Sequence, residues 1–140
     1  KWWEHVTEIW AVATNIYIEG TFPNGVQYDM ASAIQLMHNM MVAHAKAVIA
    51  YKEAGYEGKI GIVHSLESKY PYDKAKNEDV LNNQFLLDAT FLGEYRDETM
   101  EIINRLVELN NGSFHASKDD MEILKEAAYW YREVSKTKEL

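Results

Sequence analysis

The chain contains no cysteine and only two prolines and seven glycines among its 140 residues. Without cysteine there is neither a disulfide framework nor a thiolate metal site. Basic residues are also scarce, because 14 Lys and Arg stand against 22 Asp and Glu, for a formal net charge of -8. Nucleic acids and anionic membrane surfaces reward clustered positive charge, so we expect neither as a partner.

Long apolar runs are missing too, and none approaches the roughly 20 residues that cross a bilayer. No signal-peptide pattern is visible, and the chain begins at Lys1. We therefore expect a soluble protein, compatible with the cytoplasm or with a recombinant product that has no native compartment. The length suits a single domain, 1–140, whereas a complete (β/α)₈ barrel needs roughly 250 residues.

What the sequence does have is helical periodicity over most of its length. Residues 1–19 carry a wide apolar stripe at helical spacing, with Glu4 and Glu8 on the opposite face. The stripe consists of Trp3, Val6, Trp10, Ala13 and Tyr17. A strand would place Trp3, His5 and Thr7 on one face, which is a poor binary pattern. The pattern therefore predicts a terminal helix over 1–19.

Four more helices are predicted downstream. The first runs from Asp29 as N-cap to Ala54, and the next begins at Asn77. The third begins at Asp97, and the last begins at Ser117, where Asp120 completes the spacing of a capping box. Residues 60–63 are the one convincing strand candidate, because they are short, β-branched and bounded by turn residues.

These elements predict a mainly α fold, a multi-helix bundle with at most one short strand. A lone strand cannot satisfy its own backbone hydrogen bonds, so it needs a partner that the pattern does not supply. The alternative is a partial (β/α) barrel with parallel strands at 1–8 and 59–65.

Several consecutive motifs carry a resemblance. Residues 20–25 read Gly-Thr-Phe-Pro-Asn-Gly, residues 38–47 read His-Asn-Met-Met-Val-Ala-His-Ala-Lys-Ala, and residues 58–64 read Gly-Lys-Ile-Gly-Ile-Val-His. Residues 69–73 (Lys-Tyr-Pro-Tyr-Asp) and 87–95 (Leu-Asp-Ala-Thr-Phe-Leu-Gly-Glu-Tyr) continue the series. Over 20–128 the chain resembles glycoside hydrolase family 1, of the 6-phospho-β-galactosidase and 6-phospho-β-glucosidase kind. The resemblance implies descent from part of a (β/α)₈ barrel, around its fourth and fifth strands.

The resemblance also implies one catalytic position. The family's fourth strand ends in Trp-x-Thr-Phe-Asn-Glu, which falls on residues 3–8, so Glu8 matches the general acid/base. Thr7 stands where the family has the Asn that holds the sugar's 2-hydroxyl, and Val6 replaces the Phe. The partner carboxylate and the phosphate-binding Ser/Lys/Tyr cluster lie downstream in the family, and this chain stops before both. A retaining glycosidase needs two carboxyl groups about 5 to 5.5 Å apart.

Residues 129–140 read as a helical extension where the family has its sixth strand. With the helix predicted over 1–19, this favours a fragment with engineered or evolved ends: a catalytically inactive scaffold. One alternative is a remnant or self-assembling hydrolase of 6-phospho-β-glycosides, binding a phosphoglycoside only if a barrel is rebuilt, for instance in a homo-oligomer. Another is a binder of a hydrophobic ligand or cofactor, held between a Met cluster (Met30, Met37, Met40 and Met41) and the terminal Trp residues.

The histidines and acids offer little evidence of a metal site. Glu4 and Glu8 share a helical face, but no His-Glu-x-x-His pattern accompanies them, so an exposed charged face is the simpler interpretation. His38 and His44 lie about 240° apart on a helix and are predicted to be core or boundary residues. His64 ends the strand, where barrel enzymes place functional groups. No metal and no cofactor is predicted.

Overall fold

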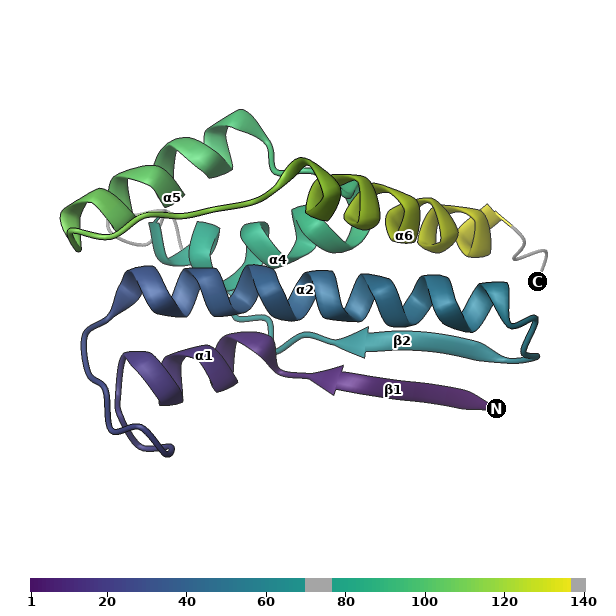
Figure 1. The fold of residues 1–140 in the computed structure, drawn as a ribbon, viewed down its shortest axis with the longest axis horizontal. Coiled ribbons are helices and arrows are strands. Elements are labelled where there is room, and N and C mark those ends of the chain that lie inside the picture. Colours follow the sequence, from purple (N-terminus) through teal and green to yellow (C-terminus); the bar gives the residue numbers. More distant parts are fainter. Residues whose placement is uncertain (70–76, 137–140) are drawn as a thin grey trace.

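The computed structural model describes residues 1–69 and 77–136, which form a layered set of helices with two short parallel strands on one side (Figure 1). The first half of the chain contains β1 (Trp2–Thr7), α1 (Ile9–Tyr17), α2 (Met30–Glu53) and β2 (Lys59–Val63). Residues 77–92 are helical and include two π-helical turns, η1 (Val80–Gln84) and η2 (Asp88–Leu92), on either side of α4 (Phe85–Leu87). The chain continues with α5 (Asp97–Leu109) and α6 (Lys118–Lys136).

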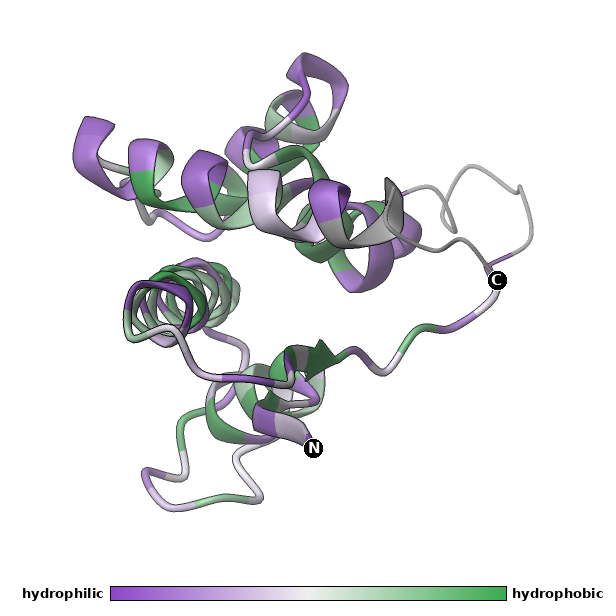
Figure 2. Cartoon of the chain, turned by 90° about the vertical axis from the view of Figure 1, so that its right-hand side faces the viewer, coloured by the Kyte–Doolittle hydropathy of each residue, from purple (hydrophilic) through white to green (hydrophobic). Residues whose placement is uncertain are grey.

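The long helix α2 occupies the middle of the molecule. The sheet and α1 lie on one side of it, and α4, α5 and α6 lie on the other (Figures 1 and 2). Its buried residues include Ile34, Met37, Met41 and Val48, and Phe85 of α4 belongs to the same core. Helix α2 is therefore the common support of both layers.

The helix predicted over 1–19 is wrong for its first third, because residues 2–7 form the strand β1. This strand pairs in parallel with β2, with Trp2 opposite Lys59, Trp3 opposite Ile60, and Thr7 opposite Val63. The predicted bundle with at most one short strand is therefore corrected to a mainly α fold with two short parallel strands. The strands lie at the positions of the alternative fold, 1–8 and 59–65, while the mainly helical character is confirmed.

A β-bulge explains why the apolar pattern favours a helix over the strand β1. Between Glu4, which pairs with Gly61, and Thr7, which pairs with Val63, β1 has two residues where β2 has only Ile62. Such an extra residue turns two successive side chains to one face. His5 stacks on α2, and Val6 packs against the core. The bulge thus breaks the alternation by which a half-buried strand is recognised in a sequence.

The other predicted helices are confirmed with small shifts at their ends. Asp29 caps α2, where its carboxylate accepts a hydrogen bond from the Ser32 amide. Helix α5 begins at Asp97. Ser117 and Asp120 form the reciprocal capping box, each side chain bonding the other's backbone N–H at 3.0 Å. In residues 1–69 and 77–136, no helix is long and apolar enough to span a membrane.

Candidate active site

The carboxyl ends of the two strands meet at one edge of the molecule. Glu8 follows β1 and His64 follows β2, and the Glu8 amide donates a hydrogen bond to the Val63 carbonyl at 2.9 Å. Parallel strands connected through helices gather ligand-binding and catalytic groups at this edge, because all their carboxyl ends point the same way. The junction of β1 and β2 is therefore the candidate site.

Glu8 adopts an unusual backbone conformation, with φ 52° and ψ 47°. This left-handed region costs a non-glycine residue on the order of 1–3 kcal/mol, and such strain gathers at functional positions. Although Glu8 is the N-cap of α1, its carboxylate accepts no hydrogen bond from that helix in the described residues. The side chain is exposed at the strand end and is not used for capping.

The face of the sheet turned away from α2 is open. Thr7 lies on this face beside Val63, its partner on β2, and the side chains of both are exposed, that of Val63 by 37%. At the other end of this face the Trp2 side chain is 76% exposed, and the Lys59 ammonium lies 4.7 Å from the centre of the Trp2 ring. In a closed barrel this face is the interior, which side chains of the other strands fill.

His64 extends from the end of β2 towards η2. Its Nε2 lies 2.8 Å from the Thr90 hydroxyl, which itself donates to the Leu86 carbonyl at 2.8 Å. The single hydroxyl proton is therefore used, so Nε2 of His64 carries the proton and Nδ1 holds a lone pair. This Nδ1 is buried and has no partner among the described residues. Burial lowers the pKa of His64, which keeps the ring neutral.

His44 links three elements. Its Nδ1 lies 3.3 Å from Nε2 of His5 on β1, and its Nε2 lies 2.6 Å from the Tyr131 hydroxyl on α6. Burial, with the neighbouring imidazoles of His5 and His64, lowers the pKa of His44 to about 3, and burial raises the pKa of Tyr131 to about 12. The hydrogen-bonded series of His5, His44 and Tyr131 is therefore neutral at ordinary pH, and it holds the bulged end of β1 against α2 and α6.

His38 makes a separate polar link from α2 to Tyr95 and α6. Its Nδ1 lies 2.7 Å from the Tyr95 hydroxyl, and its Nε2 lies 3.5 Å from the Asp120 carboxylate. Burial lowers the pKa of His38, although Asp120 opposes this shift. The prediction that His38 and His44 are core or boundary residues is confirmed, since both are buried.

The remaining candidates do not assemble into a ligand site. Glu4 pairs with Gly61 on the open face, whereas His5 turns towards α2, so the two do not converge. In the described residues no three or more His, Asp or Glu side chains cluster as a metal site would require. Met37 and Met41 are buried and Met30 and Met40 pack against the core, so the Met cluster fills space between elements.

Several features of the site had no signal in the sequence. The bulge, the contact between His44 and Tyr131, and the π-helical turn that carries Thr90 all depend on the packing of distant segments. Glu8 and His64 were singled out, but the predicted helix placed Glu8 on a solvated helical face. The structure places it at the end of a strand.

Comparisons with known proteins agree on one family. The family model described as Glycosyl hydrolase family 1 matches residues 1–131. A 6-phospho-β-galactosidase of Streptococcus mutans is 43% identical over 135 residues, which cover 91% of this chain and 29% of that protein.

Solved structures give the same picture. A β-glucosidase from Exiguobacterium marinum superposes with a TM-score of 0.67 at 26% identity, over 89% of this chain and 29% of that one. For a β-glucosidase from Trichoderma harzianum the TM-score is 0.69 at 23% identity, over 89% and 27%. This chain therefore spans less than a third of the relatives that it matches.

Proposed function

Since the chain belongs to glycosyl hydrolase family 1, we propose that it supplies the general acid/base, Glu8, of a glycosidase whose barrel is completed by further strands. The position of Glu8 at the carboxyl end of β1, beside β2 in a parallel ladder, is the observation that carries this proposal. The family match covers residues 1–131, and so includes the motif at residues 3–8 as well as the series that begins at Gly20.

In the proposed reaction Glu8 acts twice. As an acid it protonates the oxygen of the leaving group, and as a base it then takes a proton from the water that hydrolyses the glycosyl-enzyme. The nucleophilic carboxylate has to lie about 5 to 5.5 Å away. In residues 1–69 and 77–136 the two strands pair only with each other, so a further strand has to bring this second carboxylate.

We propose 6-phospho-β-glycosides as the substrates. The identity of 43% to a 6-phospho-β-galactosidase supports this class. The formal net charge of -8 disfavours phosphate binding by this chain alone, and on the open face of the sheet the Lys59 ammonium lies against the Trp2 ring. Substrate binding therefore also depends on the completed barrel.

The inactive helical scaffold remains the competing hypothesis. It was inferred from two helical ends, and the N-terminal one begins with the strand β1 in the structure. The helical C-terminal end still supports this hypothesis, because α6 stays helical to Lys136. The two hypotheses differ in what they predict for a completed barrel: turnover that depends on Glu8, or none.

A chimera tests the proposal. The segment of the Streptococcus mutans enzyme that matches this chain is replaced by residues 1–131, and turnover of nitrophenyl 6-phospho-β-galactoside is measured. We expect turnover, and Glu8→Gln should lower kcat/KM by roughly 10²–10⁴-fold, least for leaving groups that need little protonation. Glu53→Gln, which changes an exposed acid on α2, is the matched control and should change little.

Three outcomes would count against the proposal. A chimera that folds, as circular dichroism and a cooperative melt would show, but turns over no substrate would favour the inactive scaffold. A Glu8→Gln variant as active as its parent would remove Glu8 from the reaction. A Glu8→Gln loss that is the same for good and poor leaving groups would point to structural damage.

A further inference from the structure

A polar hollow of about 700 Å³ lies between the start of α2 and the segment that joins α5 to α6. Its lining includes Tyr28 and Asp29 on one side and Asn110, Asn111 and Ser113 on the other. The start of α2 and the end of α5, which border it, lie at the end of the molecule towards which both strands point (Figure 1). We name it the Tyr28 pocket; its size is within the usual range for small-molecule sites.

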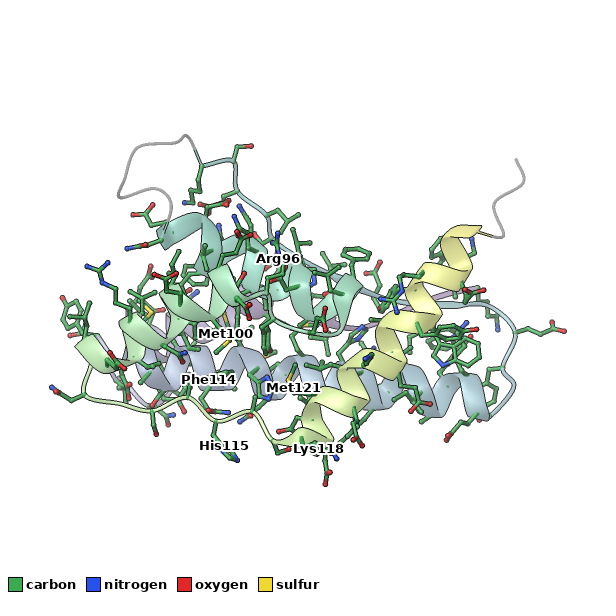
Figure 3. The ribbon with its side chains drawn as sticks, turned by 90° about the horizontal axis from the view of Figure 1, so that it is seen from above. Arg96, Met100, Phe114, His115, Lys118 and Met121 are labelled. Atoms are coloured by element: carbon green, nitrogen blue, oxygen red, sulfur yellow. The ribbon has the colours of Figure 1, made fainter. Side chains whose placement is uncertain are left out.

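The walls of the Tyr28 pocket are held together by hydrogen bonds between segments far apart in sequence. The Asn110 side chain accepts from the Ala31 amide at 3.2 Å and donates to the Tyr28 carbonyl at 3.0 Å. The Gln35 side chain makes two bonds to the backbone of His115, at 2.8 and 2.9 Å. Phe114 contacts the rings of His38 and Phe85, whereas the His115 side chain projects outward (Figure 3). The hollow is therefore preformed.

Charge argues against an anionic ligand. The amides at the start of α2 are already used, since Ser32 donates to Asp29 and Ala31 to Asn110. The carboxylate of Asp29 lies in the wall, the lining contains no Lys or Arg, and the side chain of its one histidine, His115, projects outward. A phosphate or carboxylate would meet repulsion there without a compensating cation.

The groups that take no part in the walls suit a neutral polyhydroxylated ligand. In the described residues, the Asn111 side-chain amide and the Ser113 and Tyr28 hydroxyls make no hydrogen bond, and Tyr28 is 78% exposed. An aromatic ring offers a flat apolar face with a polar tip, and an amide both donates and accepts. A sugar ring has the matching surfaces, an apolar C–H face and a rim of hydroxyls. We propose that the Tyr28 pocket binds a neutral saccharide unit, apart from Glu8.

The test is a titration of the 140-residue chain with lactose and with cellobiose, followed by amide chemical shifts. We expect shifts at Tyr28, Asn111 and Ser113, with a Kd in the millimolar range, so the titration has to reach about 50 mM. Tyr28→Asn should weaken binding roughly tenfold, about 1.4 kcal/mol. Asn tolerates the positive φ of 60° at this position, so the loss would not come from backbone strain.

Matched controls separate this proposal from the one for Glu8. Tyr56→Asn changes a tyrosine that is 66% exposed just beyond the far end of α2, and Glu8→Gln changes the acid; both should bind as the parent does. Tyr28→Phe keeps the ring and should retain most of the affinity. No shifts up to 50 mM, shifts confined to other segments, or equal binding by Tyr28→Asn would overturn the proposal, as would inorganic phosphate producing the same shifts.

Discussion

The two sides of α2 differ in how complete they are. Towards α4, α5 and α6 the helix is covered by a packed layer in which even the buried His38 has polar partners. Towards the strands it is covered by a sheet whose far face exposes Trp2 and Val63 and whose two strands pair only with each other in the described residues. Stability thus resides mainly in the helical layer, whereas the candidate chemistry lies at the edge of the open sheet.

The largest effect is expected where the helical layer is tightest. A Cβ on Gly93 would lie 2.5 Å from Cα of Lys125 on α6, and Gly93 has φ +69°. Gly93→Ala should therefore cost more than about 3 kcal/mol, from overpacking and backbone strain together. Gly55→Ala is the matched control, with φ +68° but nothing within 4 Å, and should cost about 1 kcal/mol. Urea denaturation measures both; equal losses would mean that α6 does not pack on Gly93.

The next effect concerns the link between the two sides. Tyr131→Phe removes the hydroxyl 2.6 Å from Nε2 of His44 and leaves a buried ring nitrogen unpaired. We expect a loss of about 1–3 kcal/mol in the free energy of unfolding. Tyr129→Phe, at a half-exposed neighbouring position, should change it by less than about 0.5 kcal/mol. A Tyr131→Phe variant as stable as the parent would show that the hydroxyl is hydrated and not bound to His44.

Acid should weaken the same link. The pKa of His44 is lowered from 6.5 to about 3, so between these values the unfolded chain binds a proton that the folded chain does not. The free energy of unfolding should therefore fall as pH drops below 6.5, by up to about 1.4 kcal/mol per pH unit for this group. Burial also lowers the pKa of His38 and of His64, so both residues add to the loss of unfolding free energy in acid.

Denaturation of the parent and of His44→Gln between pH 7 and 5 isolates the part due to His44. The variant should show the shallower decline, because it has one ionisable group fewer that is buried in its neutral form. Identical slopes would mean that His44 binds protons equally in the folded and the unfolded protein over this range.

The smallest effect is expected on the open face. Val63→Thr exchanges one β-branched side chain for another at a position 37% exposed, so unfolding should change by less than about 0.5 kcal/mol. In the chimera, where further strands cover this face, the same change should cost more. Equal costs in both proteins would indicate that the face stays exposed in the assembled barrel.

Helix ends could be predicted from the sequence because their signals are local. Asp29 caps α2 through an amide three residues away, and Ser117 and Asp120 cap α6 within one turn. The apolar pattern did not favour the strand β1, which only the alternative fold contained. Its hydrogen bonds go to β2, more than 50 residues further along, and its bulge disrupts the alternation at His5 and Val6. The family motif located Glu8, but only the parallel ladder shows that it ends a strand.

Amide exchange and nuclear Overhauser effects across residues 2–8 test the central claim, that β1 pairs with β2 and brings Glu8 to the strand edge. The account predicts cross-strand contacts between Trp3 and Ile60, and a Glu8 amide protected by its bond to the Val63 carbonyl. Helical contacts between residues three apart within 2–7, with a Glu8 amide that exchanges freely, would contradict it.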